Sequence, residues 1–264
     1  MTIHRHPPAV GWRAHVETQR TSKGTVLMRT PTSAVSTIDL DVYDQSVRDE
    51  VVLAADAVHA TRLRVDYLGK IHRSRDAQGE HLTAAPVAGK QFVVEVAGGK
   101  LVVTRDGKPA PDDEAEAVAD DYKVMLDPDV FPPGAFAQPL AVGKESPAIE
   151  VALTTLLQVS NDDAIVDAPR AVLLGAEGDG PDRSAVFQVE VALAHVLGGG
   201  PPIRETLQLA GEWRIALEGG WPTRVTVQGP TSYSSADESQ LACEGRGEIS
   251  LDLRRTYGGG APGS

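Results

Sequence analysis

The chain has 264 residues, of which 41% are hydrophobic and 23% charged, as in an ordinary globular protein. Its 37 acidic residues outnumber its 25 basic residues, so the formal net charge is −12. This charge argues against nucleic acid and anionic membrane surfaces as partners, because both attract basic patches. With Cys243 as its one cysteine, the chain cannot form an internal disulfide or a cysteine metal cluster.

The two ends of the chain are expected to be disordered tails. Residues 1–11 contain two consecutive prolines and no long apolar run, and residues 258–264 are mostly glycine. Residues 12–257 are expected to form a single domain, because β domains of this length are often undivided. The N-terminal residues lack the apolar run of a signal peptide, and no stretch is apolar over the length of a membrane-spanning helix, so no transmembrane segment is expected.

Residues 12–105 have the pattern of a first block of β-strands. Ile38 and Leu40 alternate with acidic neighbours, and the same alternation recurs through the block. Successive side chains of a strand point to opposite faces, so this period predicts strands with one apolar and one polar face. Gly98 and Gly99 separate two apolar runs, which predicts a tight hairpin because primed turns need positive φ.

Residues 111–126 have the pattern of an amphipathic helix. Pro111 and the acidic residues after it suit a first helical turn, where the backbone dipole is positive. The apolar residues recur at helical spacing, namely Ala115, Val118, Ala119, Tyr122, Met125 and Leu126. Glu114 and Asp121 are expected on the opposite, solvated side. Ser146 and Pro147 open a second segment, which fits either a short helix or a strand.

Residues 164–255 have the pattern of a second block of strands, with the clearest alternation at residues 204–217. The apolar residues of that stretch share one face, namely Leu207, Leu209, Trp213, Ile215 and Leu217. The two blocks predict a mainly β fold of the α+β type, with one large curved antiparallel sheet, a half-barrel, wrapped over one or two helices. Such a one-sided sheet must close on itself, cover another element or bind an apolar ligand.

The chain lacks the local motifs of common catalytic and metal sites. Gly-x-Ser-x-Gly and His-Glu-x-x-His are absent, and no Gly-x-Gly-x-x-Gly follows a predicted strand. No catalytic residue, metal site or cofactor is therefore expected. We expect Cys243 to be a small buried residue rather than a nucleophile. His195 continues an apolar strand face, so we expect a core histidine whose ring is satisfied by a backbone carbonyl.

If the concave face holds a ligand, apolar side chains of the helix and of the longest strand are expected to line it. These candidate ligand-binding residues are Val118, Tyr122, Met125 and Trp213. The same residues suit a packed core, so the pattern also fits a structural or protein-interaction domain with a filled concave face. A third hypothesis is a hydrolase or isomerase whose residues meet only in space.

The strand pair at residues 89–108 precedes the acidic helix, and Pro-Leu-Ala-Val-Gly-Lys follows at 139–144. Later strands carry Gly-Glu-Trp at 211–213 and Glu-Gly-Gly-Trp at 218–221. This layout resembles the half-barrel superfamily of bacterial envelope proteins that includes the lipoprotein carrier LolA, LppX-type lipoproteins and the stress sensor RseB.

The resemblance implies a curved antiparallel sheet around helices, with an apolar cavity for lipid or acyl chains. It implies a non-enzymatic carrier whose partner is a lipid or a lipidated protein. It also implies a periplasmic or cell-envelope location, and because the sequence has no apparent leader, a cytoplasmic location is the alternative. The pattern does not predict an oligomeric state.

Overall fold

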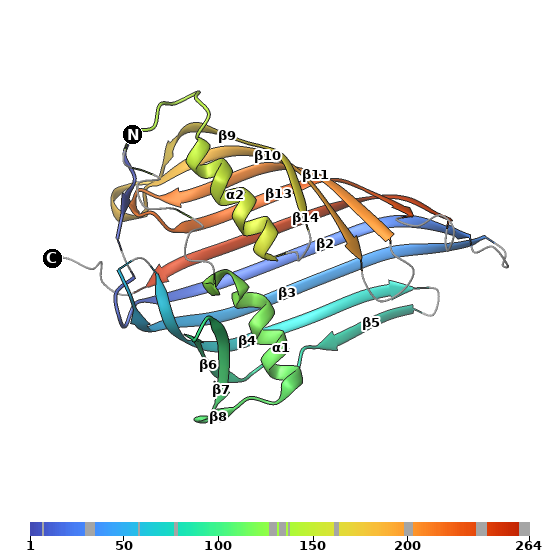
Figure 1. Cartoon of the computed structure of the whole chain (residues 1–264), viewed down its shortest axis with the longest axis horizontal. Helices are drawn as coiled ribbons and strands as arrows, with labels where there is room; N and C mark the ends of the chain where they lie inside the picture. Colours follow the sequence, from blue (N-terminus) through green and yellow to red (C-terminus); the bar gives the residue numbers. More distant parts are fainter. Residues whose placement is uncertain are drawn as a thin grey trace.

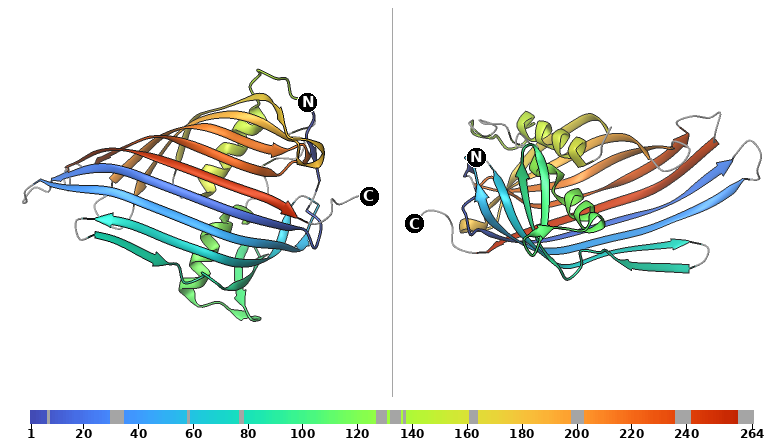
Figure 2. Two further views of the ribbon diagram at one scale, coloured as in Figure 1. Left: turned by 180° about the vertical axis from the view of Figure 1, so that it is seen from behind. Right: turned by 60° about the horizontal axis from the view of Figure 1, so that its bottom comes forward.

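The computed structural model describes residues 1–6, 8–29, 35–57, 59–76, 79–126, 131, 136, 138–160, 164–197, 203–235 and 242–258. Within these ranges, a 12-stranded antiparallel sheet forms a curved wall with two α-helices on its concave side (Figure 1). This arrangement confirms the predicted fold class. The two views of Figure 2 show the sheet bending around the helices rather than lying flat.

The sheet consists of two antiparallel runs of strands that meet in the middle. Its strand order is β8-β7-β6-β4-β3-β2-β14-β13-β11-β10-β9, with β5 paired to β4 beside β6. The pairing of β2 with β14 therefore joins the two runs, and we call it the seam. The strand bounds are β2 (Arg13–Arg29), β3 (Ser36–Ala55), β4 (Ala60–Asp76), β5 (Gly79–Ala84), β6 (Gln91–Ala97), β7 (Lys100–Arg105), β8 (Lys108–Pro109), β9 (Ile165–Glu177), β10 (Ser184–Leu197), β11 (Ile203–Ala216), β13 (Pro222–Ser235) and β14 (Ala242–Gly258).

The predicted hairpin and the predicted helix are both confirmed. Gly98 and Gly99 have φ of +58° and +74° and connect β6 to β7, as a primed turn requires. Helix α1 spans Asp112–Tyr122 and continues as a 3₁₀ turn over Lys123–Leu126. The segment with two possible readings forms helix α2, Pro147–Ser160, and not a strand.

Each helix has its own apolar cluster against the sheet. The α2 cluster joins β9, β10 and β11 to the helix through buried residues that include Ile149, Leu153, Leu173, Phe187, Trp213 and Ile215. The α1 cluster joins β4 and β6 to the helix through buried residues that include Leu63, Val65, Phe92, Val94, Val118, Tyr122 and Met125. Two separate cores therefore lie side by side on one sheet.

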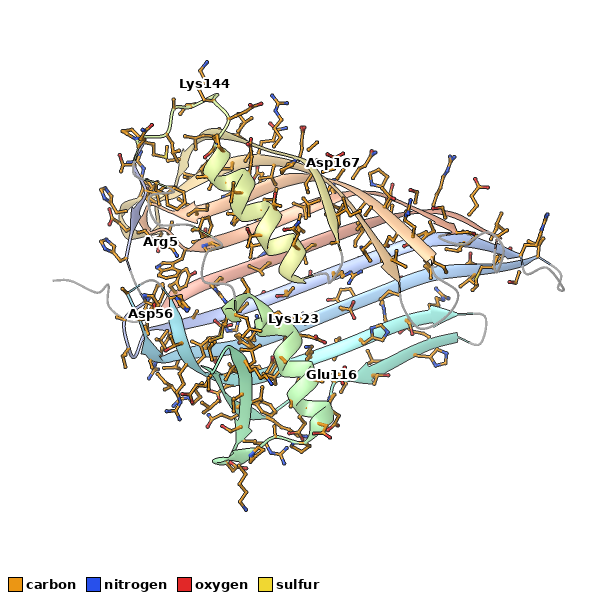
Figure 3. All side chains as sticks on the ribbon, in the orientation of Figure 1. Arg5, Asp56, Glu116, Lys123, Lys144 and Asp167 are labelled. Carbon is orange, nitrogen blue, oxygen red and sulfur yellow. The ribbon has the colours of Figure 1, made fainter. Side chains whose placement is uncertain are left out.

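The beginning of the chain is ordered, so the prediction of a disordered tail over residues 1–11 is wrong for this part. Strand β1 (His4–Arg5) pairs in parallel with β12 (Glu218–Gly219), and Ile3 is buried in the α2 cluster. The Arg5 guanidinium, labelled in Figure 3, donates to the carbonyl of Phe131. Ile3 and Met1, which both pack on the α2 cluster, thus hold this segment in place together with a short strand pairing. Residues 259–264 lie outside the described residues, and the single-domain assignment of 12–257 stays a prediction.

A line of glycines crosses the sheet from β11 to β2. A Cβ atom at any of them would lie less than 3.0 Å from the backbone of the neighbouring strand, which holds for Gly211, Gly229, Gly245, Gly247 and Gly24. At Gly229 that Cβ would overlap the carbonyl oxygen of Gln208. Glycine therefore lets the strands bend sharply toward the concave side, as in the corners of curved sheets.

We expect Gly229→Ala to destabilise the protein by about 1–3 kcal/mol, because β11 and β13 must separate to admit the methyl group. Gly69→Ala is the matched control, since a Cβ at Gly69 in β4 meets no atom within 4 Å. Its effect should stay within about 0.5 kcal/mol. Urea unfolding followed by circular dichroism measures both changes. Equal effects of the two substitutions would contradict the role given to Gly229.

Candidate functional site

The concave face carries a continuous apolar strip on the half of the sheet formed by β11, β13 and β14. Strand register aligns Val227 with Leu251 and Val225 with Leu253, so these side chains share one face. Leu209, Val225 and Leu251 pack against the α2 cluster, which identifies that face as the concave one. We call this strip the apolar floor, and it consists of Leu209, Val225, Val227, Ile249, Leu251 and Leu253.

A polar strip lies directly beside the apolar floor, across the seam. The register aligns Leu251 with Arg20 of β2, and Arg20 in turn with Asp44 of β3. Asp44 accepts a 2.7 Å hydrogen bond from the Nδ1 atom of His72 on β4. The polar strip consists of Arg20, Ser22, Asp44, Ser46, Lys70 and His72. The concave face is therefore amphipathic, with its boundary between β14 and β2.

The helices leave part of this face uncovered. In Figure 1 both helices cross the left-hand part of the sheet, and the ends of β2, β3, β13 and β14 extend beyond them to the right. Figure 3 shows side chains crowded around the helices and fewer over the extended strand ends. Leu209, Ile249 and Leu251 are only partly buried, so the apolar floor remains accessible. No helix of the described residues is long and apolar enough to cross a bilayer.

Beneath α1, three charged side chains and a tyrosine form a largely buried group that we call the central ion cluster, consisting of Arg48, Glu50, Arg255 and Tyr122. The Arg48 Nε atom donates to Glu50 Oε1 at 3.1 Å and to the Tyr122 hydroxyl at 3.0 Å. The Tyr122 hydroxyl donates to Glu50 Oε1 at 2.8 Å. Arg255 lies 2.9 Å from Glu50 Oε2. Glu50 therefore serves as the common acceptor of three donors from different elements.

The surroundings of the central ion cluster keep Glu50 ionised and Tyr122 neutral. Burial opposes the charged form of Glu50, yet Arg255 and Arg48 hold the pKa of its carboxyl below the ordinary value. Burial, reinforced by the Glu50 carboxylate, raises the pKa of Tyr122 well above its usual range. Tyr122 thus remains a neutral hydroxyl that ties α1 to β3. This hydroxyl is fully used inside the protein and is not available to a ligand.

A second buried polar group lies near the extended ends of β10, β11 and β13. Glu205 meets the His195 Nε2 atom at 3.0 Å and accepts from the Thr231 hydroxyl at 3.3 Å. The expected backbone carbonyl partner of His195 is therefore replaced by a carboxylate. Burial, with Glu205 beside it, raises the pKa of Tyr233.

Cys243 is buried as expected, and burial raises the pKa of its thiol, which disfavours the thiolate.

The structure does not bring the four candidate ligand-binding residues together. Val118, Tyr122 and Met125 lie in the α1 cluster, whereas Trp213 lies in the α2 cluster, 5.6 Å from the ring of Phe131. All four are buried among protein side chains and serve as core residues. Sequence reasoning missed the apolar floor, because alternation shows which residues share a face but not which part of that face a helix covers.

Two depressions on the surface are lined by polar and charged residues, unlike the apolar floor. One of about 280 Å³ is lined mainly by polar residues on the convex side, with His15 bound to Asp49 at 2.7 Å. The other, of about 570 Å³, lies over Gly24 and Gly247, and its rim includes charged side chains from β2, β3 and β14. Their charged linings suit neither an acyl chain nor another apolar ligand.

No known protein family matches the chain, and no curated protein is similar to it in sequence. Among solved structures, the chain is similar to one describing lipid–protein interactions in lipovitellin, with 9% identity and a TM-score of 0.40. That match covers 97% of this chain and 26% of the other, so the chain spans about a quarter of the lipovitellin chain.

Two bacterial structures are also similar to the chain. DynF from the dynemicin biosynthesis pathway of Micromonospora chersina is 7% identical, with a TM-score of 0.22 and coverage of 96% of this chain and 84% of that one. A LolA superfamily protein from Nitrosomonas europaea is 10% identical, with a TM-score of 0.17 and coverage of 94% and 85%.

Proposed function

We propose that the protein is a non-enzymatic carrier that holds a lipid or another acyl-chain ligand on its apolar floor. The observation that carries this proposal is the partial exposure of Leu209, Ile249 and Leu251 on a concave surface. Contiguous apolar side chains in such a position favour a bound apolar molecule, which removes them from water.

The dimensions and polarity of the concave face support an amphipathic ligand. Ile249 and Leu253 lie four residues apart on β14, so the floor extends over about 14 Å along this strand alone. An acyl chain lying along β14 would have the polar strip of β2 beside it, and Arg20 of that strip is exposed. A charged or hydrogen-bonding headgroup therefore has partners next to the apolar surface.

The test is a titration of the purified protein with a fluorescent fatty acid. We expect Leu251→Asn to weaken binding by about tenfold or more, because burial of one leucine side chain is worth about 1.5–3 kcal/mol. Mass spectrometry of a lipid extract from the purified protein identifies the bound species.

Leu174→Asn is the matched control, because Leu174 is an exposed leucine on β9, outside the apolar floor. Its affinity for the fatty acid should equal that of the unmodified protein. Equal affinities of the two variants, or no binding by the unmodified protein, would overturn the proposal. Thermal unfolding of both variants separates lost binding from lost folding.

The alternative is a structural or protein-interaction domain without a ligand. Its support is the core position of all four candidate residues, Val118, Tyr122, Met125 and Trp213, which fill part of the concave face. An empty lipid extract together with absent fatty-acid binding would favour this alternative.

A cell-envelope location is part of our proposal, and fractionation of the producing cells tests it against a cytoplasmic location.

A further inference from the structure

The ends of β2 and β3 project farther from the helices than any other part of the sheet (Figures 1 and 2). These strands have 17 and 20 residues and pair over most of their length. We define the β2–β3 tip as residues 25–29 and 35–40. No helix lies near the tip in either figure, so the tip is surrounded by the solvent on several sides.

Large apolar side chains are exposed at the β2–β3 tip. Leu27 is 47% exposed, Val35 50% and Ile38 43%. Ile38 pairs with the buried Val26 and so lies on the concave face, whereas Leu27 is the next residue along β2 and lies on the convex face. Apolar surface is therefore presented on both sides of one hairpin.

This two-sided arrangement distinguishes between kinds of partner. The flat surface of another protein would cover one face of the hairpin and leave the other in water. A fluid apolar phase surrounds an inserted hairpin on both faces at once. The apolar side chains at the β2–β3 tip therefore fit a lipid bilayer better than a protein surface.

The charge of the β2–β3 tip specifies the kind of bilayer. Its described residues contain one basic and one acidic side chain, Arg29 and Asp39, so their charges cancel. The whole chain has a net charge of −12 and is repelled by anionic lipid. A neutral tip on an acidic body suits a zwitterionic membrane surface.

Apolar contacts continue from the tip toward the apolar floor. A third cluster at the base of the tip contains Val26, Tyr233 and Cys243, with Met28, Leu40 and Ile203 packed against it. The buried Leu207 follows on β11, two residues before Leu209 of the apolar floor. Between the projecting end and the floor, the apolar side chains of the concave face are interrupted by the buried Glu205 and Thr231.

We propose that the β2–β3 tip inserts its exposed apolar side chains into the surface of a zwitterionic lipid bilayer. Docking itself requires only the tip. The use of docking to load or release an acyl chain on the apolar floor rests on the proposed carrier function.

The test is flotation of the full chain with phosphatidylcholine vesicles. We expect the double variant Leu27→Asp/Ile38→Asp to lose binding by about tenfold or more, because two charges replace two inserted apolar side chains. The matched control is Val142→Asp/Leu174→Asp, which adds the same charge at two exposed apolar positions elsewhere. The control should float as the unmodified protein does, and circular dichroism confirms that both variants are folded.

Added phosphatidylglycerol should weaken flotation at low salt, because the body of the protein carries the same sign of charge. No flotation of the unmodified protein, or equal flotation of the tip and control variants, would overturn the inference. Preferential binding to anionic vesicles would also overturn it.

A fatty-acid titration separates this inference from the proposed carrier function. The tip variant should bind a water-dispersed fluorescent fatty acid normally but take it up more slowly from vesicles. If the unmodified protein floats but binds no fatty acid, the carrier function fails and the docking inference stands. If the protein binds the fatty acid but does not float, the docking inference fails alone.

Discussion

Replacing Glu50 by alanine should lower the free energy of unfolding by about 3–5 kcal/mol, because Arg48 and Arg255 would lose the carboxylate between them. The Arg48 side chain is only 8% exposed, so water cannot take over the role of this carboxylate. Urea unfolding at neutral pH measures the change. The exposed Glu248 on β14 supplies the control, and Glu248→Ala should change stability by no more than about 0.5 kcal/mol.

The same carboxylate makes stability depend on pH in one direction. The folded-state pKa of Glu50 lies below its ordinary value of 4.5, so its stabilising effect is present above that pH. The effect is lost as the pH falls through the folded-state pKa. Glu50→Gln should therefore show a flatter decline of stability below about pH 4.5 than the unmodified protein. A loss under about 1 kcal/mol for Glu50→Ala, or unchanged acid sensitivity for Glu50→Gln, would contradict the role of the central ion cluster.

Trp213→Ala should also cost about 3–5 kcal/mol, because it removes the largest side chain of the α2 cluster. Trp213 is 1% exposed and contacts Phe131 through its ring. The resulting cavity would lie between β11, α2 and the ring of Phe131. Circular dichroism during urea unfolding is the appropriate measurement, since the substitution itself removes a fluorophore.

Trp213→Phe separates ring packing from the indole N–H group. The Trp213 Nε1 atom is buried and has no hydrogen-bond partner among the described residues. A buried donor without an acceptor is unfavourable, so its removal offsets part of the lost ring area. We expect Trp213→Phe to cost less than about 1.5 kcal/mol. A cost equal to that of Trp213→Ala would show that the N–H group matters more than the packing.

Much of the fold could be predicted because the relevant signals are local. Alternation identified β11, helical spacing and first-turn acids identified α1, and two glycines identified the β6–β7 turn. The pairing of β2 with β14 could not be predicted, because alternation shows which face a residue occupies and not which strand lies beside it. The ordered N-terminal strand was missed because its stability depends on the distant β12.

The hydrogen-bond partners of the polar side of α1 could not be predicted from the helical pattern either. Glu114 and Asp121 were expected on the solvated side of α1, yet Glu114 is 4% exposed and lies 2.8 Å from Lys90. Asp121 accepts hydrogen bonds from Tyr67 at 2.7 Å and Lys70 at 3.0 Å. A helical pattern separates polar from apolar residues, but it does not show that Lys70 of β4 and Lys90, just before β6, meet the polar side.

The site was the least predictable part. Of the four predicted lining residues, three lie on α1 and the turn after it and one lies on β11, and the structure buries all four in its two cores. The residues of the apolar floor alternate as Trp213 does on β11 and differ from it in how much of them α2 covers. That difference depends on where the helix ends over the sheet, which is a tertiary property.

The seam also affects how the protein is made. Its two strands come from opposite ends of the described chain, with Arg13 of β2 opposite Gly258 of β14. During synthesis, strands β2–β8 can assemble around α1 before β14 leaves the ribosome. The edge of β2 that later pairs with β14 then has no neighbouring strand. An unpaired edge of 17 residues is open to pairing with other nascent chains. The emergence of β14 therefore completes the sheet and covers the edge of β2 that would otherwise be open to other chains.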